Sequence, residues 1–285
     1  MNNLADLHAT PGKEPFLISE DGVPRVLSHD RATELISLIG YNVRLRMPDL
    51  QYLCGAVLHD RYVDKPLSLH ELASLVNVDT ISVGQLPGAP IIKMMAEKHA
   101  TALCERGGLR LGSIDYYRKY EDAEIGDTTE GLCVLAVWDG TKTVVSKFRG
   151  GLNDWLFCTF EGNVDRTIVD RMGYDSAVEI TDVKAFSSAI SAHLSSLSAN
   201  YGSIKYVRDR ALYGEVTGPI DPQDYMDGPI AEVLGDARSF LKNQYFSHQS
   251  EFRFRWKVAD KAAEFIDIVC PELTAFCRPV AMPPA

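Results

Sequence analysis

The stretch HQSEFRFRW, residues 248–256, places a carboxylate at the start of an alternating segment. From Glu251 onward, charged side chains alternate with Phe and Trp, which is the two-residue period of a strand with one apolar and one polar face. Gln249 and Glu251 form a Gln-x-Glu pair ahead of the aromatic residues. A carboxylate held at such a place can stabilise positive charge that develops in a reacting ligand. It can equally form an ion pair with Arg253 or Arg255 on the same face, so the pattern leaves both interpretations open.

Two earlier stretches carry further polar groups that could join this carboxylate. LRLGSIDYYRKYEDAEIGDTTEG holds Arg110 on an expected strand and Tyr117 in an expected polar loop. WLFCTFEGN is an expected strand that places Thr159 among aromatic residues. Strand propensity alone explains Thr159, and alternation alone explains an outward-facing Arg110. Their functional value therefore depends on whether they meet Glu251 in space.

The order of these motifs resembles a bacterial domain family of unknown function that is linked to phage resistance. The resemblance covers roughly residues 91–258 and rests on G-x-L-R-L-G-S, Tyr-Arg, Gly-Asp-x-x-Glu-Gly, an aromatic-Cys-Thr strand and HQSEFRF. This sequence has Gln249 where that family often has Glu, and Asp-Thr-Thr-Glu where it often has Asp-Pro-x-Glu. The resemblance implies a bacterial toxin or defence effector.

The same order also resembles, remotely, the ADP-ribosyltransferases that use an Arg, a Ser/Thr strand and a late Gln/Glu-x-Glu. This resemblance implies NAD as the substrate, with Arg110 holding its phosphates and Tyr117 lining the cleft. Thr159 would order the strand beside the nicotinamide, although its motif has one hydroxyl where the family has Ser-Thr-Ser. Glu251 would stabilise the oxocarbenium-like charge, and Gln249 would orient the acceptor. A Gln at that position favours a nucleic-acid base or an amide of a protein over an arginine acceptor.

Two alternatives use the same residues differently. A metal-dependent nuclease would bind its ions among Asp115, Glu121, Asp127 and Glu130, with Glu251 nearby, because such chemistry needs converging carboxylates. The chain has no H-E-x-x-H motif and no His pair at i, i+4, so we expect no zinc site. A non-enzymatic module would instead bind a partner protein through the N-terminal part of the chain.

Composition limits these choices. The 285 residues carry a net charge of −10, which disfavours a long duplex nucleic-acid footprint because phosphate neutralisation needs a basic surface. The six cysteines form no C-x-x-C pair and we recognise no signal peptide, so we expect reduced thiols in a cytoplasm. No stretch approaches 18 consecutive apolar residues, so we expect no membrane span.

The first part of the chain, residues 1–85, is expected to be an extended arm followed by a small helical region. RATELISLIGY and DLQYLCGAVLHDRY have apolar residues at helical spacing. SLHELASLV begins with a capping box, Ser68 with Glu71, which predicts a third helix. The loop GQLPGAP marks the expected boundary with the next domain.

The second part, residues 86–285, is expected to be the catalytic domain, in which short strands outnumber helices. MMAEKHATALCER predicts a helix that ends at Gly107, while DVKAFSSAISAHLSSL and AEVLGDARSFLKN predict two more. Few strand–helix–strand units are present, and no G-x-G-x-x-G or Walker motif occurs. The sequence therefore predicts an α+β fold with a mixed, mainly antiparallel sheet and flanking helices.

Overall fold

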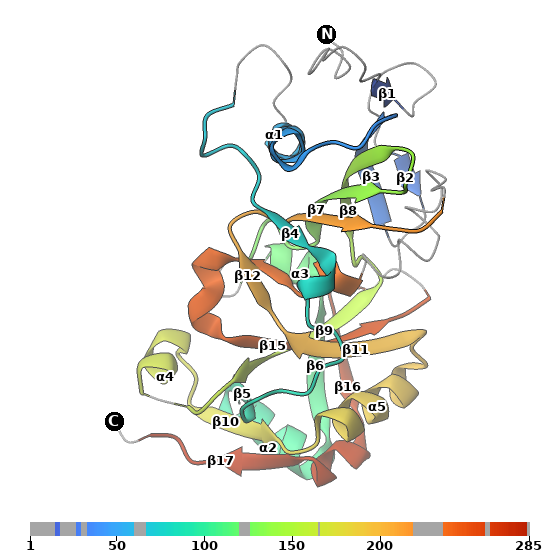
Figure 1. Cartoon of the computed structure of the whole chain (residues 1–285). Helices are drawn as coiled ribbons and strands as arrows, with labels where there is room; N and C mark the ends of the chain where they lie inside the picture. Colours follow the sequence, from blue (N-terminus) through green and yellow to red (C-terminus); the bar gives the residue numbers. More distant parts are fainter. Residues whose placement is uncertain are drawn as a thin grey trace. The chain divides into compact units, whose positions relative to one another are not determined.

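The computed structural model describes residues 15–17, 27–29, 33–59, 67–119, 126–164, 166–218, 236–259 and 263–283 (Figure 1). Most of the expected N-terminal arm, Glu121 and residues 219–235 lie outside this described part. The fold is α+β, as the sequence predicts, with sheets that are mixed or antiparallel. No helix of the described part is long and apolar enough to cross a membrane.

The chain forms two compact units, and each unit collects three separated stretches. Unit 1 comprises Met1–Ile81, Gly131–Gly150 and Val207–Asn243. Unit 2 comprises Ser82–Glu130, Gly151–Tyr206 and Gln244–Ala285. The sequence places a single boundary near residue 85, which lies close to the first crossing of the chain from unit 1 to unit 2. The chain returns to unit 1 at Gly131 and at Val207, and the amino-acid composition around these two positions does not indicate a domain boundary.

Unit 1 is built on a sheet with the strand order β1-β3-β8-β7-β13-β4, and β2 pairs with β3. Its strands are β1 Pro15–Leu17, β2 Leu27–His29, β3 Thr33–Tyr41, β4 Leu75–Asn77, β7 Leu132–Trp138, β8 Thr143–Gly150 and β13 Ala211–Glu215. Strand β13 runs parallel to β7 and β4, whereas the other pairs are antiparallel. Helix α1, Met47–Leu58, buries Leu53, Cys54 and Val57 in the apolar core of this sheet. The short elements η2, Val78–Thr80, and β14, Leu241–Asn243, complete the unit.

Three helix predictions fall in the described part of residues 1–85, and one of them is confirmed. DLQYLCGAVLHDRY forms α1, but RATELISLIGY forms the long strand β3, which pairs with β1, β2 and β8. The capping-box contacts do form, since Glu71 Oε2 accepts hydrogen bonds from Ser68 N and Ser68 Oγ at 2.9 and 2.8 Å. They close one turn only, because Leu75 then pairs with Ala211 in a parallel ladder. Pairing with distant strands overrides local helical spacing in both failures.

Unit 2 contains the sheet β11-β15-β9-β5-β10-β17, with β6 pairing to both β9 and β16. Its strands are β5 Ile91–Met95, β6 Gly108–Ser113, β9 Asp154–Glu161, β10 Ser176–Ile180, β11 Ser198–Ser203, β15 Glu251–Lys257, β16 Phe265–Val269 and β17 Cys277–Val280. All of these pairs are antiparallel. Strand β12, Lys205–Val207, lies at the end of the middle stretch.

The helices of unit 2 are α2 Glu97–Arg106, α3 Ile114–Lys119, α4 Arg166–Met172 and α5 Val183–Leu194, with the 3₁₀ helices η3 Gln244–Gln249 and η4 Pro271–Ala275. Residues of α2, α5 and η4 pack in the main apolar core of the sheet, whereas Ile168 of α4 packs in a second cluster with Ile92 and Phe160. The aromatic residues of β15, Phe252, Phe254 and Trp256, are fully buried among residues of α2 and α5. The Phe186 ring of α5 lies 5.1 Å from that of Phe254. Burial of these rings fixes the register of β15 and therefore the position of its other face.

Of the three helices predicted for residues 86–285, two are confirmed and one is wrong over its described part. MMAEKHATALCER forms α2 and ends at Gly107, and α5 begins at Asp182, whose side chain accepts a hydrogen bond from Ala185 N at 2.9 Å. The expected polar loop after β6 begins instead with the short helix α3. The described part of AEVLGDARSFLKN belongs to unit 1; it is helical only over residues 236–238 and then forms β14, so the expected helix does not extend through it.

Candidate functional site

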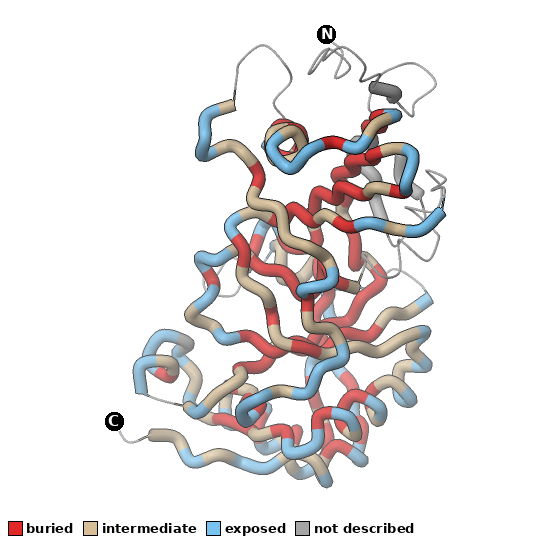
Figure 2. Tube along the Cα trace, in the orientation of Figure 1, coloured by how far each residue is buried: buried red, intermediate tan, exposed pale blue. Residues whose placement is uncertain are grey.

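The polar face of β15 is buried, although its sequence is that of a strand with one solvated side. Glu251, Arg253 and Arg255 are only 4%, 1% and 2% exposed. Strands β9 and β11 flank β15 on either side, and the strand is buried along almost its whole length (Figure 2). Ionised side chains are rarely buried without partners, because desolvation is costly. The partners of these three residues therefore define the site.

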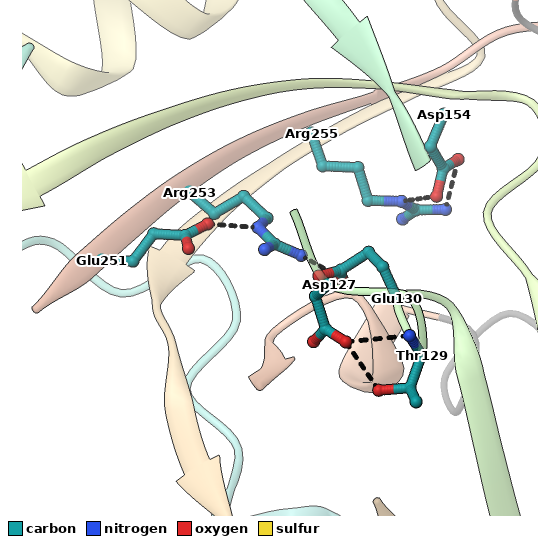
Figure 3. A network of polar contacts seen from close by, with 7 residues as sticks. All are labelled: Asp127, Thr129, Glu130, Asp154, Glu251, Arg253 and Arg255. Carbon is teal, nitrogen blue, oxygen red and sulfur yellow. Dashed lines mark hydrogen bonds and ion pairs between the residues drawn. The ribbon is translucent and has the colours of Figure 1, made fainter. Parts of the chain in front are cut away.

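Arg253 is the centre of a three-residue ion network in unit 2. Its Nε donates a hydrogen bond to Glu251 Oε1 at 2.7 Å, and its Nη1 donates to Glu130 Oε1 at 2.9 Å (Figure 3). Burial alone would lower the pKa of the guanidinium, but Glu130 and Glu251 outweigh it and hold that pKa well above its usual range. The ion pair that alternation allows between Glu251 and Arg253 is thus present, and a second carboxylate joins it.

Glu130 reaches Arg253 from the Gly-Asp-x-x-Glu-Gly loop. The Asp127 carboxylate accepts hydrogen bonds from Thr129 N at 2.9 Å and Thr129 Oγ1 at 2.7 Å, which closes a tight turn. Backbone bonds fix this turn further, since Asp127 N donates to the Tyr117 carbonyl and Glu130 N donates to the Asp127 carbonyl. Short Asp side chains commonly stabilise turns in this way. The loop and Glu251 are therefore joined through Arg253, as a shared site requires.

The next charged residue of the strand makes a second buried ion pair. Arg255 Nε and Nη2 donate to the two Asp154 carboxylate oxygens at 2.5 and 3.0 Å, and Asp154 is fully buried (Figure 3). The geometry is bidentate, which is the strongest arrangement for an arginine and a carboxylate. This pair holds β15 to the start of β9.

Cys158, on β9, faces the Arg253 position and bonds to two further polar groups. Cys158 and Arg253 are register partners across the β9–β15 ladder. The Tyr117 hydroxyl forms a hydrogen bond with the Cys158 thiol, and burial followed by the Cys158 charge raises the pKa of Tyr117 well above its usual range. Lys93 Nζ donates to the Cys158 carbonyl at 2.7 Å and lies 5.1 Å from the centre of the Phe157 ring. Burial lowers the pKa of Lys93, while Cys158 and Glu251 oppose that shift.

The backbone of Glu251 is fixed separately from its side chain. Its N–H donates to the Tyr206 hydroxyl at 2.8 Å, and its carbonyl accepts from Ile204 N at 2.9 Å. Burial raises the pKa of Tyr206, with Glu251 adding to the shift, so that this hydroxyl stays neutral. The carboxylate thus projects from a backbone that is held at both ends.

Thr159 and Gln249 lie on either side of this arrangement. Thr159 is buried, and its Oγ1 donates to the Phe252 carbonyl at 2.6 Å, which ties β9 to the residue after Glu251. Gln249 is the last residue of η3 and is half-buried. Ser250 separates it from β15 with a left-handed φ of 40°. The Gln-x-Glu pair is therefore a helix end and a strand start, not two positions of one strand.

We expect Thr159→Val to lower the free energy of unfolding by about 1 kcal/mol, because a buried hydrogen bond is lost without a change of shape. Thr181→Val is a matched control: the Thr181 Oγ1 bond to the Phe276 carbonyl is 3.2 Å long and exposed, so its loss should cost less than about 0.5 kcal/mol. Urea denaturation of both variants measures the difference. Equal costs would show that the Thr159 hydroxyl contributes nothing special to β9.

Arg110 does not join the described contacts of this cluster. It is exposed on β6, and its Nε and Nη2 donate to the two Asp267 carboxylate oxygens at 2.7 and 2.8 Å. Its guanidinium also lies 4.0 Å from the centre of the Phe265 ring. Arg110 would have to release Asp267 before it could bind a phosphate.

Metal binding has little support among the described residues. Within the described ranges, no group of three or more His, Cys, Asp or Glu side chains is arranged to hold a metal ion. Asp115 pairs with Arg118, Asp127 closes its own turn, and Glu130 binds Arg253. Three of the four carboxylates named for a nuclease site thus have other described partners, and Glu121 lies outside the described residues.

Several residues of the cluster have no signal in the sequence motifs. Lys93 and Tyr206 are isolated in sequence, and Asp154 precedes the expected strand WLFCTFEGN. The one usable signal is the pair Arg253 and Arg255, since two arginines on one face of a strand that is otherwise aromatic require acidic partners. This argument predicts carboxylate partners for the two arginines, but it does not identify which of the 39 Asp and Glu residues they are.

The arrangement holds the Glu251 carboxylate against the Arg253 guanidinium in a buried site of low dielectric, where charges interact strongly. Comparison with protein-family models gives no match, and comparisons with curated proteins and with solved structures also give none. The functional argument therefore rests on the residues themselves.

Proposed function

We propose that the chain is an ADP-ribosyltransferase-like enzyme that uses NAD, with Glu251 at the reacting ribose. The observation that supports this is the meeting of three separated stretches: Glu130 and Glu251 share Arg253, and Cys158 with Tyr117 lies beside them. In the proposed reaction, the bond between nicotinamide and ribose C1′ breaks and its electron pair leaves with the nicotinamide. Positive charge then develops on the ribose, next to a carboxylate that Arg253 already orients.

The other residues take supporting roles in the proposal. Arg253 and Glu130 position the Glu251 carboxylate, and Tyr117 provides an aromatic surface beside it. Gln249, half-buried at the end of η3, orients an acceptor whose nucleophile attacks C1′ and releases a proton. A nucleic-acid base or a protein amide is the proposed acceptor. The setting that the family resemblance favours is a toxin or phage-defence effector in a bacterial cytoplasm.

The fit of NAD to the described residues is partial. The ribose side has a fixed carboxylate and a tyrosine, whereas Arg110, the residue proposed for the phosphates, is bound to Asp267. If Arg110 binds the phosphates, its replacement by Ala should raise KM for NAD more than it lowers kcat. If Arg110 only holds β16 beside β6, Arg110→Ala and Asp267→Ala should leave both constants unchanged.

The test compares nicotinamide release from NAD by the native protein, Glu251→Gln and Glu264→Gln. Loss of the Glu251 charge should lower the rate by at least about 100-fold, because one oriented electrostatic group contributes that much. Glu264 is the control, since its carboxylate is exposed and pairs with Lys119 at the surface. Each protein is assayed alone and with RNA, DNA or a bacterial extract as acceptor, and circular dichroism confirms folding.

The acceptor that stimulates release would identify the target class. Absence of release from folded native protein under every condition would contradict the transferase proposal and leave a binding module as the better explanation. If Glu251→Gln and Glu264→Gln lowered the rate of nicotinamide release equally, the activity would not depend on the β15 cluster.

A further inference from the structure

Unit 1 contains a cavity that the proposed NAD chemistry does not use. The cavity has a volume of about 210 Å³ and is lined by the first turn of α1 and by the ends of β7 and β13. Trp138 and Glu215 are the last residues of these two parallel strands, and they are register partners. Ligands commonly bind at the carboxyl ends of parallel strands, where the chain turns away from the sheet. The cavity therefore lies where the fold favours a binding site.

Most of the cavity lining is apolar. The aliphatic residues and the methionine that line it are Leu45, Met47, Leu50, Ala136 and Val137. Trp138 and Tyr213 also line it, and both are half-buried, so their rings can contact a ligand. Pockets for drug-sized ligands have volumes of about 300–1,000 Å³. The smaller volume here fits a compact ligand with about one ring.

Two arginines bring positive charge to this cavity. Both Arg44 and Arg46 line it. The Arg44 guanidinium lies 6.0 Å from the centre of the Trp138 ring and forms an ion pair with Glu215. Arg46 is the N-cap residue of α1, and its Nε donates to Asp49 Oδ2 at 3.1 Å. The positive end of the α1 dipole adds to the charge of the two arginines, so the polar part of a ligand should be an anion.

The ion pairs of both arginines are at the surface. The side chains of Arg44 and Glu215 are 62% and 58% exposed, and that of Arg46 is 81% exposed. Exposed ion pairs contribute little free energy, so an anion of the ligand can replace Glu215 on Arg44 at small cost. A carboxylate matches the two parallel N–H donors of a guanidinium. Glu215 and Asp49 remain near and repel a dianion more than a monoanion, which favours a carboxylate over a phosphate monoester.

We propose that this cavity binds a small aromatic monocarboxylate. The ring of the ligand lies among the apolar residues beside Trp138, and its carboxylate binds Arg44. Arg46 and the first turn of α1 add positive charge at the same end. All the lining residues belong to unit 1, whereas Glu251 belongs to unit 2. Binding therefore does not depend on the proposed transferase activity and can be tested whether or not that activity exists.

The experiment titrates the full chain with phenylpropionate, which joins one ring to one carboxylate. The tryptophans of the protein are isotopically labelled, and their indole N–H signals are followed by NMR. Trp155 and Trp256, the other two tryptophans of the chain, are buried in unit 2. We expect only the Trp138 signal, identified by its loss in Trp138→Phe, to shift. The shift should saturate with a dissociation constant on the order of 1 mM, as is typical of a ligand with about ten non-hydrogen atoms.

Two related compounds test the charge of the ligand. Phenylpropanol keeps the ring and lacks the carboxylate, and phenyl phosphate replaces the carboxylate by a dianion. Both should bind at least about tenfold more weakly than phenylpropionate, because a hydrogen bond to a charged group contributes more than a tenfold change in affinity.

Two variants at the cavity should change the affinity for phenylpropionate in opposite directions. Arg44→Met should weaken binding at least about tenfold, since the bond to the carboxylate is lost. Glu215→Gln should strengthen binding about threefold, because Arg44 loses a competing partner and the ligand loses a repelling charge. Arg278→Met is the control, since Arg278 also forms a surface ion pair, with Glu179 of unit 2. It should leave the affinity unchanged.

Opposite effects of Arg44→Met and Glu215→Gln would also show that unfolding does not cause the loss in the first variant. An unchanged Trp138 signal, a shift of all three indole signals, or equal affinity for phenylpropanol would overturn the proposal. Tighter binding of phenyl phosphate would contradict the assignment of a monocarboxylate. Equal weakening in Arg44→Met and Arg278→Met would show that the carboxylate does not bind at this cavity.

Discussion

Arg253→Met should lower the free energy of unfolding by about 3–5 kcal/mol, the usual cost of removing one partner from a buried ion network. Arg253 is 1% exposed and binds both Glu130 and Glu251, so its removal leaves two buried carboxylates without their shared cation. Methionine keeps most of the volume of the side chain, so the loss reports on charge more than on packing. Urea denaturation at neutral pH measures this change.

Arg110→Met is the matched control for this variant. Its pair with Asp267 has similar distances, but side-chain exposures of 50% and 60% make it a surface interaction. Removing it should cost at most about 1 kcal/mol. Equal losses in the two variants would show that burial adds nothing to the Arg253 network.

Gly107→Ala should destabilise the protein by about 2–5 kcal/mol. Gly107 ends α2 with a left-handed φ of 66°, where a Cβ costs about 1–2 kcal/mol. A Cβ at this position would also lie 1.8 Å from the backbone carbonyl oxygen of Cys270. The Cys270 N–H donates to the Gly107 carbonyl at 2.9 Å, so neither backbone can move without breaking that bond. Overpacking of this kind adds about 1–3 kcal/mol.

Gly173→Ala separates the two causes. Gly173 has the same φ of 66°, yet no described atom lies within 4 Å of the place that a Cβ would occupy. We expect a loss of about 1 kcal/mol from backbone conformation alone. Urea unfolding measures the loss of unfolding free energy in both variants, and the difference between the two losses is the cost of the clash with Cys270. Equal losses would mean that the segment around Cys270 moves away at no cost.

Short-range patterns in the sequence identify much of unit 2. The alternation in EFRFRW predicts β15, the apolar spacing after Asp182 predicts α5, and the two glycines after Arg106 predict the end of α2. These features follow from side-chain periodicity and local backbone preferences, which neighbouring residues determine. The sequence motifs also lie in stretches that are close together in the structure. The Glu130 loop, the strand with Cys158 and Glu251 form one cluster.

The partners within that cluster depend on long-range pairing. Arg253 is joined to a carboxylate 123 positions earlier in the chain, and Arg255 to one 101 positions earlier. Alternation shows that both arginines share a face of β15, but it does not show that this face is buried. Arg110, a motif residue of equal prominence, pairs with Asp267 at the surface instead.

By itself, the sequence determined the α+β class, the helices α1, α2 and α5, and the alternating strand that carries Glu251, because each is encoded within a few consecutive residues. The tertiary structure decided that RATELISLIGY is a strand, that each unit combines three stretches of the chain, and that Glu251, Arg253 and Glu130 form one buried network. The reason is that strand pairing and charge burial depend on residues far apart in the sequence, whose proximity only the folded chain creates.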